Sequence, residues 1–303
     1  MLIKSVLIIA CIACTTFTAQ ASSQCSKSGV HLQVLGSGGP ENGDKRASSG
    51  YIIWQEGKAR AMIDMGPGSL LRFEETGAQI NDVEVILLSH LHVDHSADLP
   101  AYVKASFFTN RSRDLPLYGP AANKKMPATT QYVQSLLGPS GAFKYLSSYL
   151  DGSDTYQLQP HDVDANLKEE QVIINKDGLR IAAIAVNHGP IPALAWRVEL
   201  DGKAFVFSGD MSGKNNTLTK LAQKADILVA HHAIPEGTKG IARNLHMPPS
   251  VIGKIAADAE VKQLVLSHRM LRTLGEEQRT SDIIRKIYKK PYHFAEDLQC
   301  FSP

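Results

Sequence analysis

Residues 83–95 read Val-Glu-Val-Ile-Leu-Leu-Ser-His-Leu-His-Val-Asp-His. The apolar part of this stretch is typical of a buried strand, which gains nothing from imidazole groups at its end. His90 and His92 are two apart in extended chain, so their side chains point the same way, and Asp94 and His95 follow where a helix can begin. A group of surface polar residues is the alternative. Four ligand-type side chains within six residues favour a site for zinc or a similar divalent cation.

Composition places few limits on function. The chain has 303 residues, of which 43% are hydrophobic and 20% are charged, which suits one large or two small globular domains. The formal net charge is only +2. We therefore expect neither a nucleic acid nor a membrane surface as partner, because no strong field would attract one.

The first 21 residues have the features of a secretory signal peptide. Lys4 precedes a short apolar run, and Ala19-Gln20-Ala21 fits a cleavage site. A membrane anchor is disfavoured because the run is too brief to span a bilayer. A lipoprotein signal at Cys11 is disfavoured because the residues before it, Ile8-Ile9-Ala10, fit such a signal poorly. We expect a periplasmic or extracellular protein, residues 22–303, without stable membrane insertion.

Two cysteines remain after removal of the signal, Cys25 and Cys300, one near each end of the mature chain. Because export leads to an oxidising compartment, we predict that they form a disulfide. Two free thiols are the alternative. Zinc ligation is disfavoured because the CxxC spacing is missing.

Other ligand-type residues also follow apolar runs that predict strands. These are His188, Asp210, His231 with His232, and His268. Asp64 follows a further strand, where it either forms a turn or accepts a hydrogen bond from a ligating histidine. His246 lies in a loop before a helix that Pro248 opens.

Strands and helices alternate along residues 22–303, and hairpin turns are expected at Glu56-Gly57 and Asp201-Gly202. This order indicates a single layered α/β domain with mixed sheets.

Residues 109–170 are harder to assign. We expect a strand at 115–118 and helices at 121–137 and 142–150, and interpret the segment as an insertion that caps the site; packing without a substrate role is the alternative.

The HxHxDH motif with its ordered downstream ligands resembles the metallo-β-lactamase superfamily. The resemblance covers nearly all of the mature chain and implies a four-layer αββα sandwich of two mixed β-sheets, with metal at one edge. It assigns His90, His92 and His188 to one zinc ion, Asp94, His95 and His268 to a second, and Asp210 to both. It further implies that a hydroxide shared by the two ions attacks the substrate and that Asp94 takes a proton. Manganese or iron would also accept these ligands.

Within the superfamily, three features resemble the ribonuclease Z and arylsulfatase-like branch. They are the opening Leu35-Gly36-Ser37-Gly38-Gly39, Leu99-Pro100 after the motif, and His246. The resemblance implies that His246 assists phosphoryl transfer, and a solvent-exposed loop histidine is the alternative.

Two departures bear on the substrate. Ribonuclease Z grips transfer RNA with an arm between its third ligand histidine and its bridging aspartate, but here only residues 189–209 lie between His188 and Asp210. Ribonuclease Z also has His-Glu at the position of His231-His232, where the glutamate orients the catalytic histidine. We give His231 no metal role.

We therefore expect an exported hydrolase with two metal ions that cleaves small phosphodiesters or aryl sulfate esters rather than a nucleic acid. A lactonase of the same fold is the main alternative. A transfer-RNA 3′-processing endonuclease and a non-catalytic metal-binding module fit less well. Relatives often dimerise, so a homodimer stays open.

Overall fold

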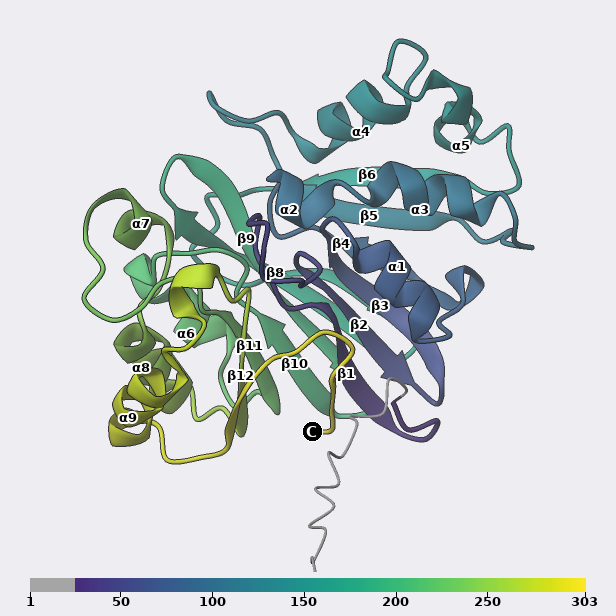
Figure 1. The fold of residues 1–303 in the computed structure, drawn as a ribbon. Helices are drawn as coiled ribbons and strands as arrows, with labels where there is room; N and C mark the ends of the chain where they lie inside the picture. The colour runs from purple at the N-terminus through teal and green to yellow at the C-terminus, as the bar shows by residue number, and fades with distance from the viewer. Residues whose placement is uncertain (1–24) are drawn as a thin grey trace, which may run out of the picture.

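Two seven-stranded mixed sheets face each other in the computed structural model, which describes residues 25–303 (Figure 1). Helices cover both outer faces, so the expected four-layer αββα sandwich is confirmed. The predicted signal peptide lies outside the described residues. Among residues 25–303, no helix is both long and apolar enough to cross a bilayer.

The first sheet has the strand order β14-β1-β2-β3-β4-β5-β6. Its strands are β1 (Val30–Gly36), β2 (Gly50–Gln55), β3 (Lys58–Met65), β4 (Val85–Leu87), β5 (Leu115–Pro120), β6 (Leu158–Val163) and β14 (Cys300–Phe301). Strands β3 to β6 run parallel to one another, and β14, β1, β2 and β3 are antiparallel neighbours.

The second sheet repeats this plan with the order β13-β12-β11-β10-β9-β8-β7. Its strands are β7 (Gln171–Lys176), β8 (Leu179–His188), β9 (Ile191–Leu200), β10 (Lys203–Phe207), β11 (Ile227–His231), β12 (Gln263–Ser267) and β13 (Tyr292–Phe294). Strands β7 to β10 are antiparallel, and β10 to β13 are parallel. The expected hairpin between β9 and β10 turns at Asp201-Gly202.

Most helices of residues 25–303 pack on the outer faces of the two sheets. The helices are α1 (Ser69–Glu75), α2 (Val93–Ser96), α3 (Leu99–Ser106), α4 (Thr129–Leu137), α5 (Ser148–Asp151), α6 (Thr217–Leu221), α7 (Gly240–Leu245), α8 (Pro249–Asp258) and α9 (Glu277–Ile287). In Figure 1, α1 and α3 lie beside the first sheet, and α8 and α9 lie together outside the second.

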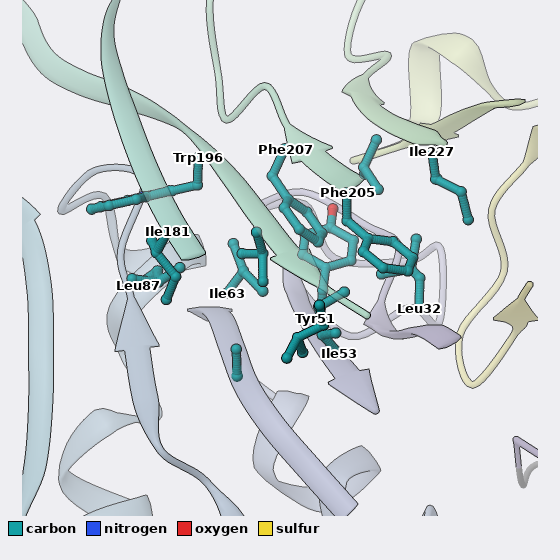
Figure 2. Close-up of a cluster of buried hydrophobic side chains, with 14 of the residues drawn as sticks. Leu32, Tyr51, Ile53, Ile63, Leu87, Ile181, Trp196, Phe205, Phe207 and Ile227 are labelled. Carbon is teal, nitrogen blue, oxygen red and sulfur yellow. The ribbon is translucent and has the colours of Figure 1, made fainter. Parts of the chain in front are cut away.

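Strand β2 is apolar at almost every position because both of its faces are buried. Tyr51 and Ile53 point into the core between the sheets, whereas Ile52 and Trp54 point into the core under the helices. Side chains alternate along a strand, so a strand covered on both faces needs apolar residues at consecutive positions. Figure 2 shows the core between the sheets, with Tyr51 next to Phe207, whose ring centroid is 5.4 Å away.

The predicted disulfide is confirmed, because Cys25 and Cys300 are bonded with their Cα atoms 5.6 Å apart. Cys300 lies in β14, which pairs with β1. The bond therefore joins the start of the described chain to its last strand.

Residues 109–170 differ in detail from the sequence expectation. The expected helix 121–137 begins only at Thr129, because Pro127 restricts the residue before it and has no N–H to donate. The expected helix 142–150 is a 3-10 turn, Lys144–Leu146, followed by α5. Strand β6 was not predicted, and together with β5 it completes one edge of the first sheet. The capping role of this segment stays a prediction.

Candidate metal centre

The predicted ligands come from segments that end at one edge of the sandwich. His90 and His92 follow β4, Asp94 and His95 lie in α2, and His188 is the last residue of β8. Asp210 follows β10 and His268 follows β12. Carboxyl ends of neighbouring parallel strands meet at the same edge of a sheet, which explains how distant parts of the chain converge there.

One group of possible metal ligands consists of His90, His92 and His188, whose ligand nitrogens all lie within 4.8 Å of one another. Nε2 of His90 is 3.0 Å from Nδ1 of His92. The ring centroids of His90 and His188 are 4.9 Å apart. These three imidazoles match the set that the sequence assigns to one ion.

A second group, with ligand atoms within the same 4.8 Å limit, consists of His95, Asp210, His231 and His268. Asp210 also belongs to a third group with His188 and His246. Its Oδ2 atom is 3.9 Å from Nε2 of His95 and 3.9 Å from Nε2 of His188. Asp210 therefore stands between the two histidine groups, where a bridging carboxylate is expected.

Asp94 completes the predicted set, although it belongs to none of these groups. Its Oδ2 atom is 3.2 Å from Nε2 of His268 and 3.4 Å from Nε2 of His95. All seven predicted ligands thus meet in one place.

Several imidazole nitrogens in this cluster are buried and lack a hydrogen-bond partner among the described residues. They are Nε2 of His95, Nε2 of His188, Nδ1 of His246 and Nδ1 of His268. Buried polar atoms almost always have a partner. Nε2 of His95 and Nε2 of His188 each lie 3.9 Å from Oδ2 of Asp210, and unpaired nitrogens beside a carboxylate are what a divalent cation requires, so these residues fit a metal centre.

The pKa shifts of His90 and Asp210 agree with this fit, whereas nearby carboxylates, against the effect of burial, raise the pKa of His95 and of His268. Burial and the neighbouring imidazoles of His95 and His188 lower the pKa of His90 well below its usual value. Burial would raise the pKa of Asp210, but the imidazoles around it, His268 first, hold that pKa well below its usual value. Asp210 is therefore a carboxylate at neutral pH, and His90 is a neutral imidazole with a lone pair to share.

Contacts outside the cluster fix two of the imidazole rings. Asp64 accepts hydrogen bonds from Nδ1 of His95 at 2.7 Å and from the backbone N–H of Ser89 at 2.7 Å. Nδ1 of His188 donates to the carbonyl oxygen of Leu245 at 3.0 Å. In both rings Nε2 is left to face the cluster. Both roles expected for Asp64 are therefore present. It accepts a hydrogen bond from a predicted ligand, His95, and its backbone has a positive φ of 55°, as in a turn.

The sequence gives His231 no metal role and leaves a structural or an orienting role open. Its Nδ1 atom donates to Oδ1 of Asp210 at 2.9 Å, and its Nε2 atom lies 3.2 Å from the hydroxyl of Tyr51. His232, the next residue, points away from the centre and lies 3.3 Å from the hydroxyl of Thr280. The signal in the sequence was the position of His231 at the end of a strand between those of two predicted ligands.

His246 ends α7 at the rim of the centre, and 8% of its surface is exposed. Its Nδ1 atom is 3.7 Å from Oδ2 of Asp210. Burial lowers the pKa of His246 to about 4, and the charge of Arg272 adds to this shift. Arg272 donates through Nε to the carbonyl oxygen of Ala233, and within residues 25–303 no carboxylate lies within 4.0 Å of its guanidinium group.

Comparison with known proteins identifies the family. The model of the β-lactamase superfamily domain matches residues 60–269, and the chain belongs to this family. Ribonuclease Z from Mycobacterium bovis is 28% identical over 204 residues, which cover 66% of this chain and 69% of that protein.

Two solved structures share the fold. The metallo-β-lactamase fold protein YhfI from Bacillus subtilis has a TM-score of 0.69 and 18% identity, with 90% of this chain and 98% of that one covered. The short form of human tRNase Z has a TM-score of 0.68 at the same identity and coverage. The chain is thus a superfamily hydrolase that fits the ribonuclease Z-like branch.

These findings correct one expectation. We expected no nucleic-acid partner, and this is wrong, because the related proteins are named ribonuclease Z. Net charge misled the interpretation because it averages over the whole surface. A site that binds one phosphodiester needs cations only near that phosphate.

Proposed function

We propose that this protein is a metal-dependent phosphodiesterase that hydrolyses RNA. The observation that carries the proposal is the position of Asp210 between the two histidine groups, in a chain whose relatives are named ribonuclease Z. Aryl sulfate esters receive no support from these relatives.

The proposed centre holds two zinc ions. His90, His92 and His188 would bind one, Asp94, His95 and His268 the other, and Asp210 both. Such ions neutralise charge on phosphate oxygens and lower the pKa of a water molecule toward 7. Asp94 is suited to accept a proton beside the reacting phosphate. His246, whose lowered pKa makes it a neutral imidazole at pH 7, is suited to donate a hydrogen bond to the leaving-group oxygen.

Arg272 supports an anionic substrate. Its guanidinium group is exposed near His246, and no carboxylate of residues 25–303 neutralises it. A guanidinium fork matches the oxygens of a phosphodiester, whereas the neutral ring of a lactone would not need it. This residue favours phosphodiesters over the lactonase alternative.

This protein must bind its substrate without an arm of the kind that ribonuclease Z has between its third ligand histidine and its bridging aspartate. Strands β8 and β9 are joined through Gly189-Pro190, and β9 and β10 through Asp201-Gly202. We infer that the enzyme holds a short stretch of RNA next to the cleaved bond.

We also propose that the protein acts outside the cytoplasm. The support is the disulfide between Cys25 and Cys300, together with the signal-like sequence of residues 1–21. Disulfides persist in oxidising compartments. Fractionation of cells that express the full chain would test this, and a product that keeps residues 1–21 in the cytoplasm would contradict it.

A substrate panel tests the proposed activity. The zinc-loaded protein is assayed on RNA with a single-stranded 3′ end, on bis(4-nitrophenyl) phosphate, on 4-nitrophenyl sulfate and on a lactone. We expect hydrolysis of both phosphodiesters. Turnover of the sulfate or the lactone without turnover of either phosphodiester would overturn the proposal.

His246→Ala tests the proposed hydrogen bond to the leaving-group oxygen. We expect kcat on RNA to fall by about 10²- to 10³-fold while the zinc content stays unchanged, because removal of one hydrogen-bond donor to developing negative charge typically costs this much. His161→Ala is the control, since His161 is exposed on β6 and stacks on Tyr118. An unchanged rate in His246→Ala would refute the assignment.

A further inference from the structure

A pocket of about 560 Å³ is lined by residues of α2, α3, α4 and the turn at residues 143–146. Its walls include Pro100, Tyr132, Phe143 and Tyr145. Tyr145 is 65% exposed and Phe143 is 38% exposed. Contiguous apolar side chains exposed on a surface are a mark of interaction and ligand-binding sites.

The pocket adjoins the metal centre. Val93 lies in the wall, is 65% exposed and stands between the predicted ligands His92 and Asp94. The hydroxyl of Tyr132 donates to Ser96 in α2, and the hydroxyl of Ser96 donates to the carbonyl oxygen of His92 at 3.0 Å. A group bound in the pocket would therefore be next to the segment that carries the ligands.

Lys104 gives the pocket a positive charge. Its ammonium nitrogen is 4.2 Å from the ring centroid of Phe107, 5.0 Å from that of Phe108 and 6.0 Å from that of Tyr145. Within residues 25–303, no carboxylate lies within 4.0 Å of it. Its neighbours are ring faces, so its charge is free to attract an anion from solution.

We propose that this pocket is a subsite for an unpaired nucleobase of the RNA substrate, which stacks on Tyr145 while Lys104 pairs with an adjoining phosphate. The inference rests on the proposed function and names the part of the substrate that the site recognises. Exposed rings beside an unpaired cation are how proteins hold single-stranded nucleic acid without reading its sequence. A concave pocket of this volume suits one planar group, whereas a second copy of the chain would need a far larger area.

A binding measurement tests the subsite. The probe is a single-stranded RNA hexamer that contains 2-aminopurine, whose fluorescence falls when the base stacks on a ring. It is titrated into the zinc-loaded full mature chain, in a His246→Ala background so that hydrolysis is slow. We expect saturable quenching, and about a tenfold rise in Kd for Tyr145→Ala, because one stacked base contributes roughly 1–3 kcal/mol.

Lys104→Ala should raise Kd as well and reduce the salt dependence of binding by about one phosphate contact. Leu71→Ala is the matched control, because Leu71 is an exposed apolar residue on α1. The Kd of this variant for the probe should equal that of the parent. Melting temperatures close to the parent's would show that the variants fold, as expected for exposed side chains.

The subsite proposal is overturned if the parent does not quench the probe, or if Tyr145→Ala and Lys104→Ala bind it as the parent does. The proposal is also overturned if the variants bind the probe as the parent does and sedimentation shows a dimer that is lost in Tyr145→Ala. That result would identify the surface as an interface between copies of the chain. Binding through the pocket without any RNA hydrolysis would refute the proposed function and leave the subsite in place.

Discussion

At the scale of single residues, side chains outside the ligand set determine where the ligand nitrogens point. His95 uses Nδ1 to reach Asp64, and His188 uses Nδ1 to reach the Leu245 carbonyl. A histidine whose Nδ1 donates a hydrogen bond keeps its proton there and presents an Nε2 lone pair. The ring orientations are thus set by the protein itself.

Asp64→Asn tests this arrangement. The asparagine would turn its NH₂ group toward a donor, either His95 or the backbone N–H of Ser89, so one hydrogen bond would be lost. We expect the zinc affinity to fall about 10- to 100-fold, as measured by competition with a chelating dye. Asp177→Asn, an exposed turn residue with a positive φ, should bind zinc as the parent does. An unchanged affinity in Asp64→Asn would show that the contact does not orient His95.

The ends of apolar runs pointed to the seven predicted ligands and also to His231 and His232, and the resemblance to the metallo-β-lactamase superfamily selected those seven as expected ligands. The sequence left the role of His231 open, because two histidines end the same strand and the pattern does not show which one faces the edge. The pairing of β11 between β10 and β12 decides this, and places His231 against Asp210 and His232 against Thr280.

At the scale of elements, the end of β3 and helix α2 are in unusually close contact. A Cβ atom on Gly66 would lie 2.1 Å from the carbonyl oxygen of Asp94 and 2.7 Å from Cβ of Ser48. Only glycine permits this approach, which brings the backbone of the HxHxDH segment against the first sheet.

Gly66→Ala should therefore shift α2 and lower the free energy of unfolding by about 3 kcal/mol, with a loss of bound zinc. Urea unfolding and zinc content measure the two effects. Gly253→Ala is the control, because its new Cβ would make only ordinary contacts on α8, the closest at 3.6 Å from Cα of Ile284. That variant should be equal in stability or up to about 1 kcal/mol more stable. Equal stability of Gly66→Ala and the parent would contradict this account.

Elements with long apolar runs were predictable, and those that are half exposed were not. Strand β8 is buried along most of its length and stands out in the sequence. Strand β7 has no fully buried residue, so its side chains carry little of the hydrophobic signal on which a prediction depends. Strand β6 begins and ends with buried residues but has Pro160 and two exposed residues between them.

At the scale of the whole molecule, the chain forms one sheet after the other and then returns. Strands β1 to β6 build the first sheet, β7 to β13 build the second, and β14 pairs again with β1. The disulfide between Cys25 and Cys300 holds this return in place.

Replacement of both cysteines by serine should lower the free energy of unfolding by about 2–5 kcal/mol, because the bond restricts the unfolded chain over a long loop. Urea unfolding of the oxidised parent and of the double variant measures the difference. The reduced parent is the control and should match the double variant. If the oxidised parent and the double variant unfold at the same urea concentration, the bond does not contribute to stability.

The most direct test of the central claim is the zinc content of the mature protein and of Asp210→Ala after equilibrium dialysis, measured by elemental mass spectrometry. If Asp210 joins two histidine groups into one centre, the parent binds two zinc ions per chain and Asp210→Ala loses at least one of them together with phosphodiester hydrolysis. A parent that binds no zinc, or an Asp210→Ala protein that keeps both ions, would contradict the claim.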